Sequence, residues 1–297
     1  MPETSSPVRP PASPDRRARL RAAPVRLAFG LLDRVAPPLA ARWALDIWCT
    51  LPNNSGRRRD ERPAGGVVTE LAGPGRTRLA IETWGSGPPV YLVHGWGGWR
   101  GQLGAFVEPL VAAGHRVIGF DAPGHGDSAP GVLGSRRGNA AEFARALSDV
   151  VDAHGPAAGV IAHSLGSATA ALAVHDGAPV ARLAVIAPSP DFIRMTQALP
   201  VHLGYGAQTH QRFLAQLAAL AERPLADFDM TTLDVGATPA LIVHDRLDKE
   251  VPYADSARLA DAWPRAEFVT TEGLGHQRIL QDPAVVERVC RFVAAAA

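Results

Sequence analysis

Residues 160–166 of this chain read Val-Ile-Ala-His-Ser-Leu-Gly, an apolar run that ends in a serine and leads into an alanine-rich segment. This pattern predicts a buried strand that turns sharply into a helix, with Ser164 at the turn. A turn tight enough to lift the hydroxyl clear of a sheet needs small residues two before and two after the serine. Ala162 and Gly166 stand there. The stretch therefore predicts a nucleophile elbow with Ser164 as the nucleophile.

Other segments carry the groups that such a serine needs. The glycine-rich residues 94–99, His-Gly-Trp-Gly-Gly-Trp, follow an apolar run and can turn backbone N–H groups inward. Asp245 and Asp248 follow a second apolar run, and His276 ends a Gly-Leu-Gly-His sequence near the C-terminus. Because a serine hydroxyl is a weak nucleophile at neutral pH, it needs a nearby base, and a histidine suits that task.

In this chain order of serine, acid and histidine, the sequence resembles the α/β-hydrolase superfamily. The resemblance covers about Val67 to the C-terminus, and residues 121–128, Asp-Ala-Pro-Gly-His-Gly-Asp-Ser, are similar to the D-x-x-G-x-G-x-S loop of that superfamily. It implies an α/β fold with a mostly parallel central sheet flanked by helices. Alternating strand and helix patterns from Val67 onward agree, with two antiparallel entry strands expected within 69–84.

The resemblance also assigns roles within the expected site. His276 is the expected base, and a carboxylate is needed to orient its ring. The superfamily pattern G-x-x-D-x-x-V-P aligns Asp248 with this acid and Asp245 with the glycine, so Asp248 is preferred and Asp245 is the alternative. The backbone N–H groups of Trp96 and Leu165 are the expected oxyanion donors, by resemblance.

Composition places the chain in one broad class. It has 297 residues, 46% of them hydrophobic, with a net charge of +1, so one catalytic domain is expected and no nucleic-acid partner. The two cysteines form no disulfide framework, and no metal or cofactor motif is present. Arg16-Arg17 precedes an apolar patch at 27–32 that is too short for an export signal, so a cytoplasmic location is expected.

The N-terminal part reads differently from the rest. Apolar residues recur at helical spacing over 39–51, which predicts an amphipathic helix. Docking on the catalytic domain is expected rather than lipid contact, because its polar face lacks a basic cluster. The expected organisation is a disordered segment (1–24), an amphipathic helical segment (25–51), a linker (52–66) and the hydrolase domain (67–297) with a small helical cap at about 190–236.

The resulting hypothesis is a serine hydrolase that cleaves a carboxylic ester through an acyl-enzyme on Ser164. The substrate is expected to be a small molecule, uncharged and partly apolar, because the cap segment is rich in apolar residues: Phe192, Ile193, Met195, Leu199, Val201, Leu203, Phe213, Leu214 and Leu217. The same groups also suit an aminopeptidase, a thioesterase or a carbon–carbon bond hydrolase, and a non-catalytic binding protein on this scaffold is a further alternative.

Overall fold

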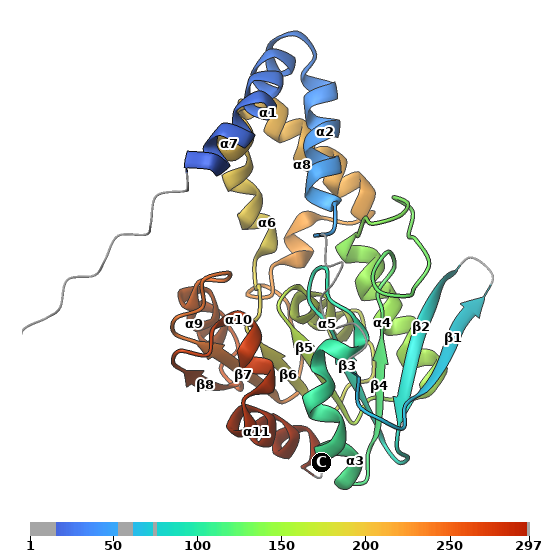
Figure 1. Ribbon diagram of the computed structural model, residues 1–297. Coiled ribbons are helices and arrows are strands. Elements are labelled where there is room, and N and C mark those ends of the chain that lie inside the picture. The colour runs from blue at the N-terminus through green and yellow to red at the C-terminus, as the bar shows by residue number, and fades with distance from the viewer. Residues whose placement is uncertain (1–15, 53–61, 74–75, 296–297) are drawn as a thin grey trace, which may run out of the picture. The chain divides into compact units, whose positions relative to one another are not determined.

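The computed structural model describes residues 16–52, 62–73 and 76–295, and for residues 16–22, Gly73 and Arg76 it gives the backbone alone (Figure 1). The strands are β1 (Val67–Gly73), β2 (Arg76–Trp84), β3 (Pro89–Val93), β4 (Arg116–Phe120), β5 (Gly159–His163), β6 (Leu183–Ile186), β7 (Ala240–Asp245) and β8 (Glu267–Thr271). The α-helices are α1 (Arg16–Val35), α2 (Pro37–Cys49), α3 (Val107–Ala112), α4 (Ala140–His154), α5 (Leu165–His175), α6 (Phe192–Met195), α7 (Leu199–Leu203), α8 (Ala207–Ala221), α9 (Tyr253–Ala262), α10 (Gly275–Arg278) and α11 (Pro283–Ala294). The 3₁₀ helices are η1 (Arg100–Phe106), η2 (Thr196–Ala198), η3 (Leu225–Phe228) and η4 (Ile279–Gln281).

The strands form one sheet in the order β1-β2-β4-β3-β5-β6-β7-β8. β1 pairs with β2 and β2 with β4 in antiparallel fashion, and every other pairing is parallel. At the centre, Leu92 of β3 pairs with Gly119 of β4 and with Ile161 of β5. The predicted mostly parallel sheet with two antiparallel entry strands is confirmed.

Both faces of the central strands are buried, which is why these strands read as continuous apolar runs. Tyr91 and Val93 of β3 belong to the core that includes α4 and α5. Val90 and Leu92 of the same strand belong to the core that includes η1, α3 and α11. The alternation of side chains along a strand therefore distributes one run of apolar residues between two cores.

A buried charged cluster joins η1 to the loop after β4. The Arg100 side chain, 3% exposed, contacts Glu82 through Nε at 3.1 Å, Asp127 through Nη2 at 2.8 Å and Asp121 through Nη1. Burial acts to lower the pKa of Arg100, but the Asp121 and Asp127 carboxylates outweigh it and raise that pKa. Asp121 also accepts hydrogen bonds from the backbone N–H groups of Arg100 and Asp127, so this ion pair holds the 121–128 loop in place.

The chain divides into two compact units, and the division does not follow the predicted domain boundaries. One unit contains residues 46–196 and 217–297, with the whole sheet; the other contains residues up to Leu45 together with 197–216. In the second unit Phe29 of α1 stacks on Trp43 of α2 with ring centroids 4.2 Å apart, and lies 5.6 Å from Tyr205. The predicted cap insertion is thus split, since its middle part groups with the N-terminal helices.

The predicted N-terminal boundaries need correction as well. α1 begins at Arg16, so the expectation of disorder up to Pro24 is wrong for residues 16–24, whereas residues 1–15 and much of the predicted linker, 53–61, lie outside the described residues. The predicted helical segment is two helices, because Pro37 and Pro38 start a new helix at α2. Within the described ranges, no helix has the length and hydropathy needed to cross a bilayer.

Candidate active site

Ser164 lies at the sharp turn between β5 and α5. Its φ of 54° and ψ of −124° are rarely adopted by residues other than glycine. Gly166 makes this turn possible, because a Cβ atom there would lie 2.3 Å from the His94 carbonyl oxygen and 2.9 Å from that of Val93. The elbow is therefore packed directly against the end of β3.

This contact predicts that Gly166→Ala will displace the elbow. The obstructing atoms belong to the backbone at the end of β3, so relief requires Ser164 or the 94–98 loop to move. We expect kcat for ester hydrolysis to fall at least ~100-fold, the usual cost of a displacement near 1 Å in an active site. Gly30→Ala is the matched control, because a Cβ there would lie 3.6 Å from the Gly204 carbonyl oxygen, an ordinary contact distance. Equal activity of both variants would contradict the prediction.

The structure brings three of the predicted site residues into one hydrogen-bonded chain. His276 Nε2 lies 3.0 Å from Ser164 Oγ, and His276 Nδ1 lies 2.7 Å from Asp248 Oδ2. His276 is buried, in the short helix α10 that follows β8. Because the carboxylate accepts from Nδ1–H, Nε2 is left free to accept the proton of the serine hydroxyl.

Asp248 has a full set of hydrogen-bond donors. Its Oδ1 accepts from the backbone N–H groups of Glu250 at 2.7 Å and Val251 at 3.0 Å. Its Oδ2 faces His276 and also His244 Nε2 at 3.2 Å. Burial acts to raise the pKa of Asp248, but the hydrogen bonds from His244, His276 and Val251 outweigh it, so this pKa lies well below its usual range. The carboxylate is therefore ionised wherever His276 can act as a base.

His244 extends this chain beyond the carboxylate. Its Nε2 lies 3.2 Å from both Asp248 Oδ2 and the Val251 carbonyl oxygen, two acceptors, so this nitrogen carries a proton. Its Nδ1 lies 2.5 Å from Ser256 Oγ. Sequence reasoning missed His244, although its position at the end of an apolar strand, four residues before Asp248, was a usable signal.

Asp245, the alternative acid, has a different place. Its carboxylate accepts from the Thr271 hydroxyl at 2.8 Å and from the backbone N–H groups of Leu247, Gly273 and Leu274 at 2.9–3.2 Å. Burial acts to raise its pKa, but these hydrogen bonds lower it overall. Asp245 thus ties the loop that precedes His276 to the end of β7, and it is Asp248 that contacts the imidazole.

The predicted oxyanion donors lie on two segments beside Ser164. Leu165 is the first residue of α5, where N–H groups have no partner within the helix. Trp96 belongs to the 94–98 loop, which approaches the serine so closely that a Cβ on Gly95 would lie 3.1 Å from Ser164 Cβ. Trp96 and Leu165 stay the predicted oxyanion donors.

Two buried histidines hold the loops of the site. His94 Nδ1 donates to the Gly95 carbonyl at 2.7 Å, and its Nε2 accepts from the Ala122 N–H at 3.1 Å, which joins the 94–98 and 121–128 loops. His163 Nε2 lies 3.0 Å from the His276 carbonyl oxygen. Burial lowers the pKa of His94 to about 4, and burial together with the nearby His276 lowers that of His163 to about 3.

These lowered pKa values predict a loss of stability in mild acid. Below about pH 6.5 the unfolded chain binds protons at positions 94 and 163 that the folded protein does not. We expect the free energy of unfolding to fall by up to ~1.4 kcal/mol per pH unit for each histidine as the pH drops from 6.5 toward 4. Urea unfolding at several pH values measures this slope. His163→Gln should reduce this dependence of the unfolding free energy on pH, and the exposed His202→Gln should leave it unchanged. Equal slopes in the wild type and both variants would contradict the role given to His163.

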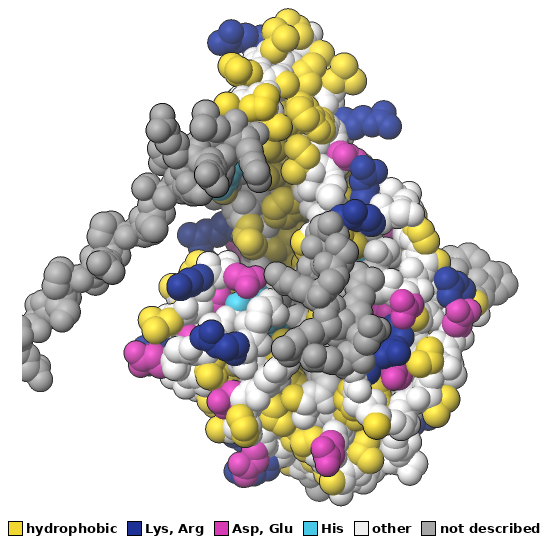
Figure 2. Space-filling model, viewed as in Figure 1, with side chains coloured by type: hydrophobic (Ala, Val, Ile, Leu, Met, Phe, Trp, Pro, Cys, Tyr) yellow, Lys and Arg dark blue, Asp and Glu magenta, His cyan; other side chains and the backbone are white. Residues whose placement is uncertain are grey.

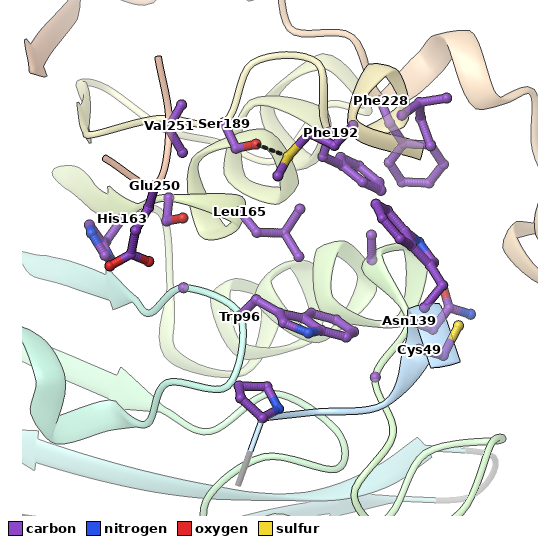
Figure 3. Close-up of a pocket in the computed structure, with 18 of the residues that line it drawn as sticks. Cys49, Trp96, Asn139, His163, Leu165, Ser189, Phe192, Phe228, Glu250 and Val251 are labelled. Carbon is purple, nitrogen blue, oxygen red and sulfur yellow. Dashed lines mark hydrogen bonds between the residues drawn. The ribbon is translucent and has the colours of Figure 1, made fainter. Parts of the chain in front are cut away.

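A cavity of about 400 Å³ opens beside Ser164 and His276. Aromatic and aliphatic side chains dominate its wall, and Figure 3 shows Trp96, Leu165, Phe192 and Phe228 directed into it. The apolar residues that line it include Trp48, Trp96, Leu165, Phe192, Ile193, Met195, Leu217, Leu220, Leu225, Phe228 and Val251. Its polar groups include Asn139, Ser189 and Glu250.

The predicted cap residues separate into two groups. Phe192, Ile193, Met195 and Leu217 line the cavity, whereas Phe213 is buried in the other unit and Val201 is 71% exposed. Sequence reasoning missed Trp48, which stacks on Phe192 with ring centroids 6.5 Å apart. The end of α2 is fixed to the sheet-containing unit, because the Gly138 N–H donates to the Cys49 carbonyl and the Leu51 N–H to that of Arg136. The role of Trp48 in the cavity wall was not expected from the sequence.

No metal centre is suggested by the part of the chain that the structure describes, since His, Cys, Asp and Glu side chains form no group of three or more that could hold an ion. Cys49 and Cys290 are both buried thiols there, and burial raises the pKa of each to about 12.

Sheet order, elbow and site together define the class, and the chain belongs to the α/β-hydrolase superfamily. Residues 88–235 match the family model described as alpha/beta hydrolase fold, and residues 219–297 match that of TAP-like protein. Enzymes with esterase names are among its relatives, so the chain is an α/β-hydrolase enzyme.

Particular relatives cover most of the chain. A pimeloyl-[acyl-carrier protein] methyl ester esterase of Aeromonas salmonicida is 26% identical over 72% of this chain and 98% of its own length. A non-heme haloperoxidase of Rhodococcus erythropolis is 34% identical over 67% of this chain and 89% of its own. The crystal structure of a membrane phospholipase A, at 18% identity, superposes with a TM-score of 0.59 on 95% of this chain and 100% of its own, a likeness of fold.

Proposed function

We propose that this protein is a serine hydrolase that cleaves a carboxylic ester through an acyl-enzyme. The observation that carries the proposal is the hydrogen-bonded chain from Ser164 Oγ through His276 to Asp248, at 3.0 and 2.7 Å, at the mouth of an apolar cavity. Ser164 is the nucleophile, His276 the general base and Asp248 the acid that orients it. His94 and His163 are weaker candidates for the base, because both ring nitrogens of His94 and Nε2 of His163 contact loops, whereas His276 Nε2 contacts Ser164 Oγ.

The first half-reaction acylates the serine. His276 Nε2 takes the hydroxyl proton as Ser164 Oγ forms a bond to the ester carbonyl carbon. The tetrahedral oxyanion is stabilised by the N–H groups of Trp96 and Leu165, each worth about 3 kcal/mol in related systems. His276 then returns the proton to the departing alkoxide oxygen, the carbon–oxygen bond of the ester breaks, and the alcohol leaves.

The second half-reaction uses water in place of the serine. His276 takes a proton from water, the resulting oxygen nucleophile attacks the acyl carbon, and the proton passes to Ser164 Oγ as the acid leaves. Asp248 remains ionised throughout, because its four hydrogen bonds hold its pKa well below the usual range. Its charge stabilises the imidazolium formed in both halves.

An ester with an uncharged, partly apolar acyl group fits the cavity best. Trp48, Trp96, Phe192 and Phe228 offer apolar contact area beside the serine, and among the residues that the structure describes no Lys or Arg side chain lines the cavity. The relative from Aeromonas salmonicida is named for the cleavage of a methyl ester of an acyl chain, which supports the ester class.

A peptidase with the same three residues is the second candidate, and Glu250 favours it. This carboxylate lines the cavity, is 60% exposed and lies 3.9 Å from His276 Nε2, where it could attract the ammonium group of a peptide's N-terminus. Thioesterase and carbon–carbon hydrolase activity, and a binding role without turnover, are not favoured by any particular contact. Hydrolysis rates for alanine p-nitroanilide relative to p-nitrophenyl esters separate the two candidates.

The proposal is tested with p-nitrophenyl esters of graded acyl length. We expect Ser164→Ala to lower kcat by at least about 10⁴-fold, because the covalent intermediate can no longer form. Ser189→Ala is the matched control: this buried serine also lines the cavity, but its hydroxyl contacts Met195 Sδ at 3.5 Å rather than His276. Near-background rates in the wild type as well as in both variants would overturn the ester proposal.

A further inference from the structure

α1 has hydrophobic side chains on two opposite sides. Phe29 is fully buried against Trp43 and Tyr205. Leu27, Leu31 and Val35, spaced four residues apart and therefore on one face, are 75%, 62% and 69% exposed. Figure 2 shows hydrophobic side chains gathered over α1 and α2. A helix that is apolar on both sides needs an apolar partner for its outer face.

Two further exposed aliphatic side chains lie on other elements of the same unit. Leu39 at the start of α2 is 59% exposed and Val201 in α7 is 71% exposed. All five side chains are aliphatic and more than half exposed, and all five belong to one unit. We call Leu27, Leu31, Val35, Leu39 and Val201 the aliphatic stripe.

Positive charge is concentrated in the unit that carries this stripe. Its segments 16–45 and 197–216 contain eight arginines and one carboxylate, Asp33, whereas the whole chain has a net charge of +1. These arginines are Arg16, Arg17, Arg19, Arg21, Arg26, Arg34, Arg42 and Arg212. Arg34 follows Leu31 by three residues and Arg42 follows Leu39 by three, and both arginines are exposed. Cationic groups thus flank exposed aliphatic ones.

We propose that the aliphatic stripe and its flanking arginines bind the surface of a bilayer that contains anionic phospholipids. The stripe would insert among the acyl chains near the headgroups, and the guanidinium groups would pair with lipid phosphates. Such a surface matches both features at once, since it offers a hydrocarbon layer beside a layer of negative charge. A second copy of this chain matches poorly, because it would bring two arginine-rich segments together.

The test is co-sedimentation of the full chain with vesicles of phosphatidylcholine alone or with one third phosphatidylglycerol. We expect binding to the anionic vesicles and weak binding to the neutral ones. Leu27→Gln with Leu31→Gln should weaken binding at least ~tenfold, because neither position then has an apolar side chain to bury in the bilayer. Val67→Gln with Val132→Gln is the matched control, since these valines lie in the other unit and are 62% and 73% exposed, close to the values for the two leucines.

A second pair of variants tests the charge. Arg34→Gln with Arg42→Gln should weaken binding to anionic vesicles about 25-fold, which corresponds to about fivefold for each cation. Arg145→Gln with Arg265→Gln removes the same charge from exposed positions in the other unit and should change binding little. Equal losses in both arginine pairs would overturn the proposal in favour of non-specific attraction.

Other outcomes would also overturn it. Self-association that the leucine variants abolish, without vesicle binding, would assign the stripe to a second copy. Binding to poly-glutamate that the arginine variants weaken and the leucine variants do not would assign the arginines to an acidic protein. Hydrolysis of a soluble p-nitrophenyl ester should stay at the wild-type rate in all four variants, so failure of this proposal is distinct from failure of the proposed function.

Discussion

Asp248→Asn should lower kcat for ester hydrolysis by about 10⁴-fold, the size of the effect when a triad aspartate is replaced in a serine protease. The backbone N–H groups of Glu250 and Val251 donate to Asp248 Oδ1, so the amide oxygen of an asparagine would occupy that position. Its NH₂ group would then face His276 Nδ1. A ring that accepts at Nδ1 carries its proton on Nε2 and cannot take the proton of Ser164.

Asp245→Asn is the control for this prediction and decides between the two aspartates. Asp245 anchors Thr271, Gly273 and Leu274 in the loop before His276 and does not contact the imidazole. We expect this variant to lower stability more than kcat. The measurements are ester hydrolysis rates and urea unfolding of both variants. A larger loss of kcat in Asp245→Asn than in Asp248→Asn would reverse the assignment of the acid.

Arg100→Gln should give the largest loss of stability. It would leave the Asp121 carboxylate, 0% exposed, without its buried cation, and Glu82, 5% exposed, with only Arg62 at 3.2 Å. Removing one partner of a buried ion pair typically costs about 3–5 kcal/mol, because the remaining charge cannot be solvated. For a protein of this size such a loss corresponds to a fall in Tm of roughly 10 °C. Urea unfolding and thermal melting measure it.

Arg78→Gln is the matched control for Arg100. Arg78 also pairs with a glutamate, Glu70, but these side chains are 44% and 57% exposed. An exposed pair contributes about 0–1 kcal/mol, because water solvates either charge when the other is removed. If both variants unfold at the same urea concentration, the buried Arg100 cluster does not stabilise the folded protein more than the exposed Arg78–Glu70 pair does.

The central strands could be predicted from sequence with small errors at their ends. The expected strand at 89–93 agrees with β3, and the apolar run that ends at Ser164 agrees with β5. Strands buried on both faces have a strong local signature, since nearly every residue must be apolar. The elbow could be predicted for a similar reason, because its tight turn restricts residue size at Ala162 and Gly166.

The N-terminal helices were harder to predict. Arginines and prolines around residues 16–24 suggested disorder, but α1 includes Pro24 and packs through Phe29 on Trp43 and Tyr205. Tyr205, whose ring contacts Phe29, lies more than 170 residues away in the sequence. Local propensity could not reveal a helix that is stabilised by such distant contacts.

The sequence by itself determined the superfamily, the mostly parallel sheet with its antiparallel entry strands and the residue types of the candidate site, because these depend on local runs and short motifs. Tertiary structure alone decided which aspartate contacts His276, that His244 supports it, and that Trp48 lines the cavity. It also decided that Arg100 holds three carboxylates. Each of these depends on side chains brought together by long-range packing, whose distances no sequence spacing specifies.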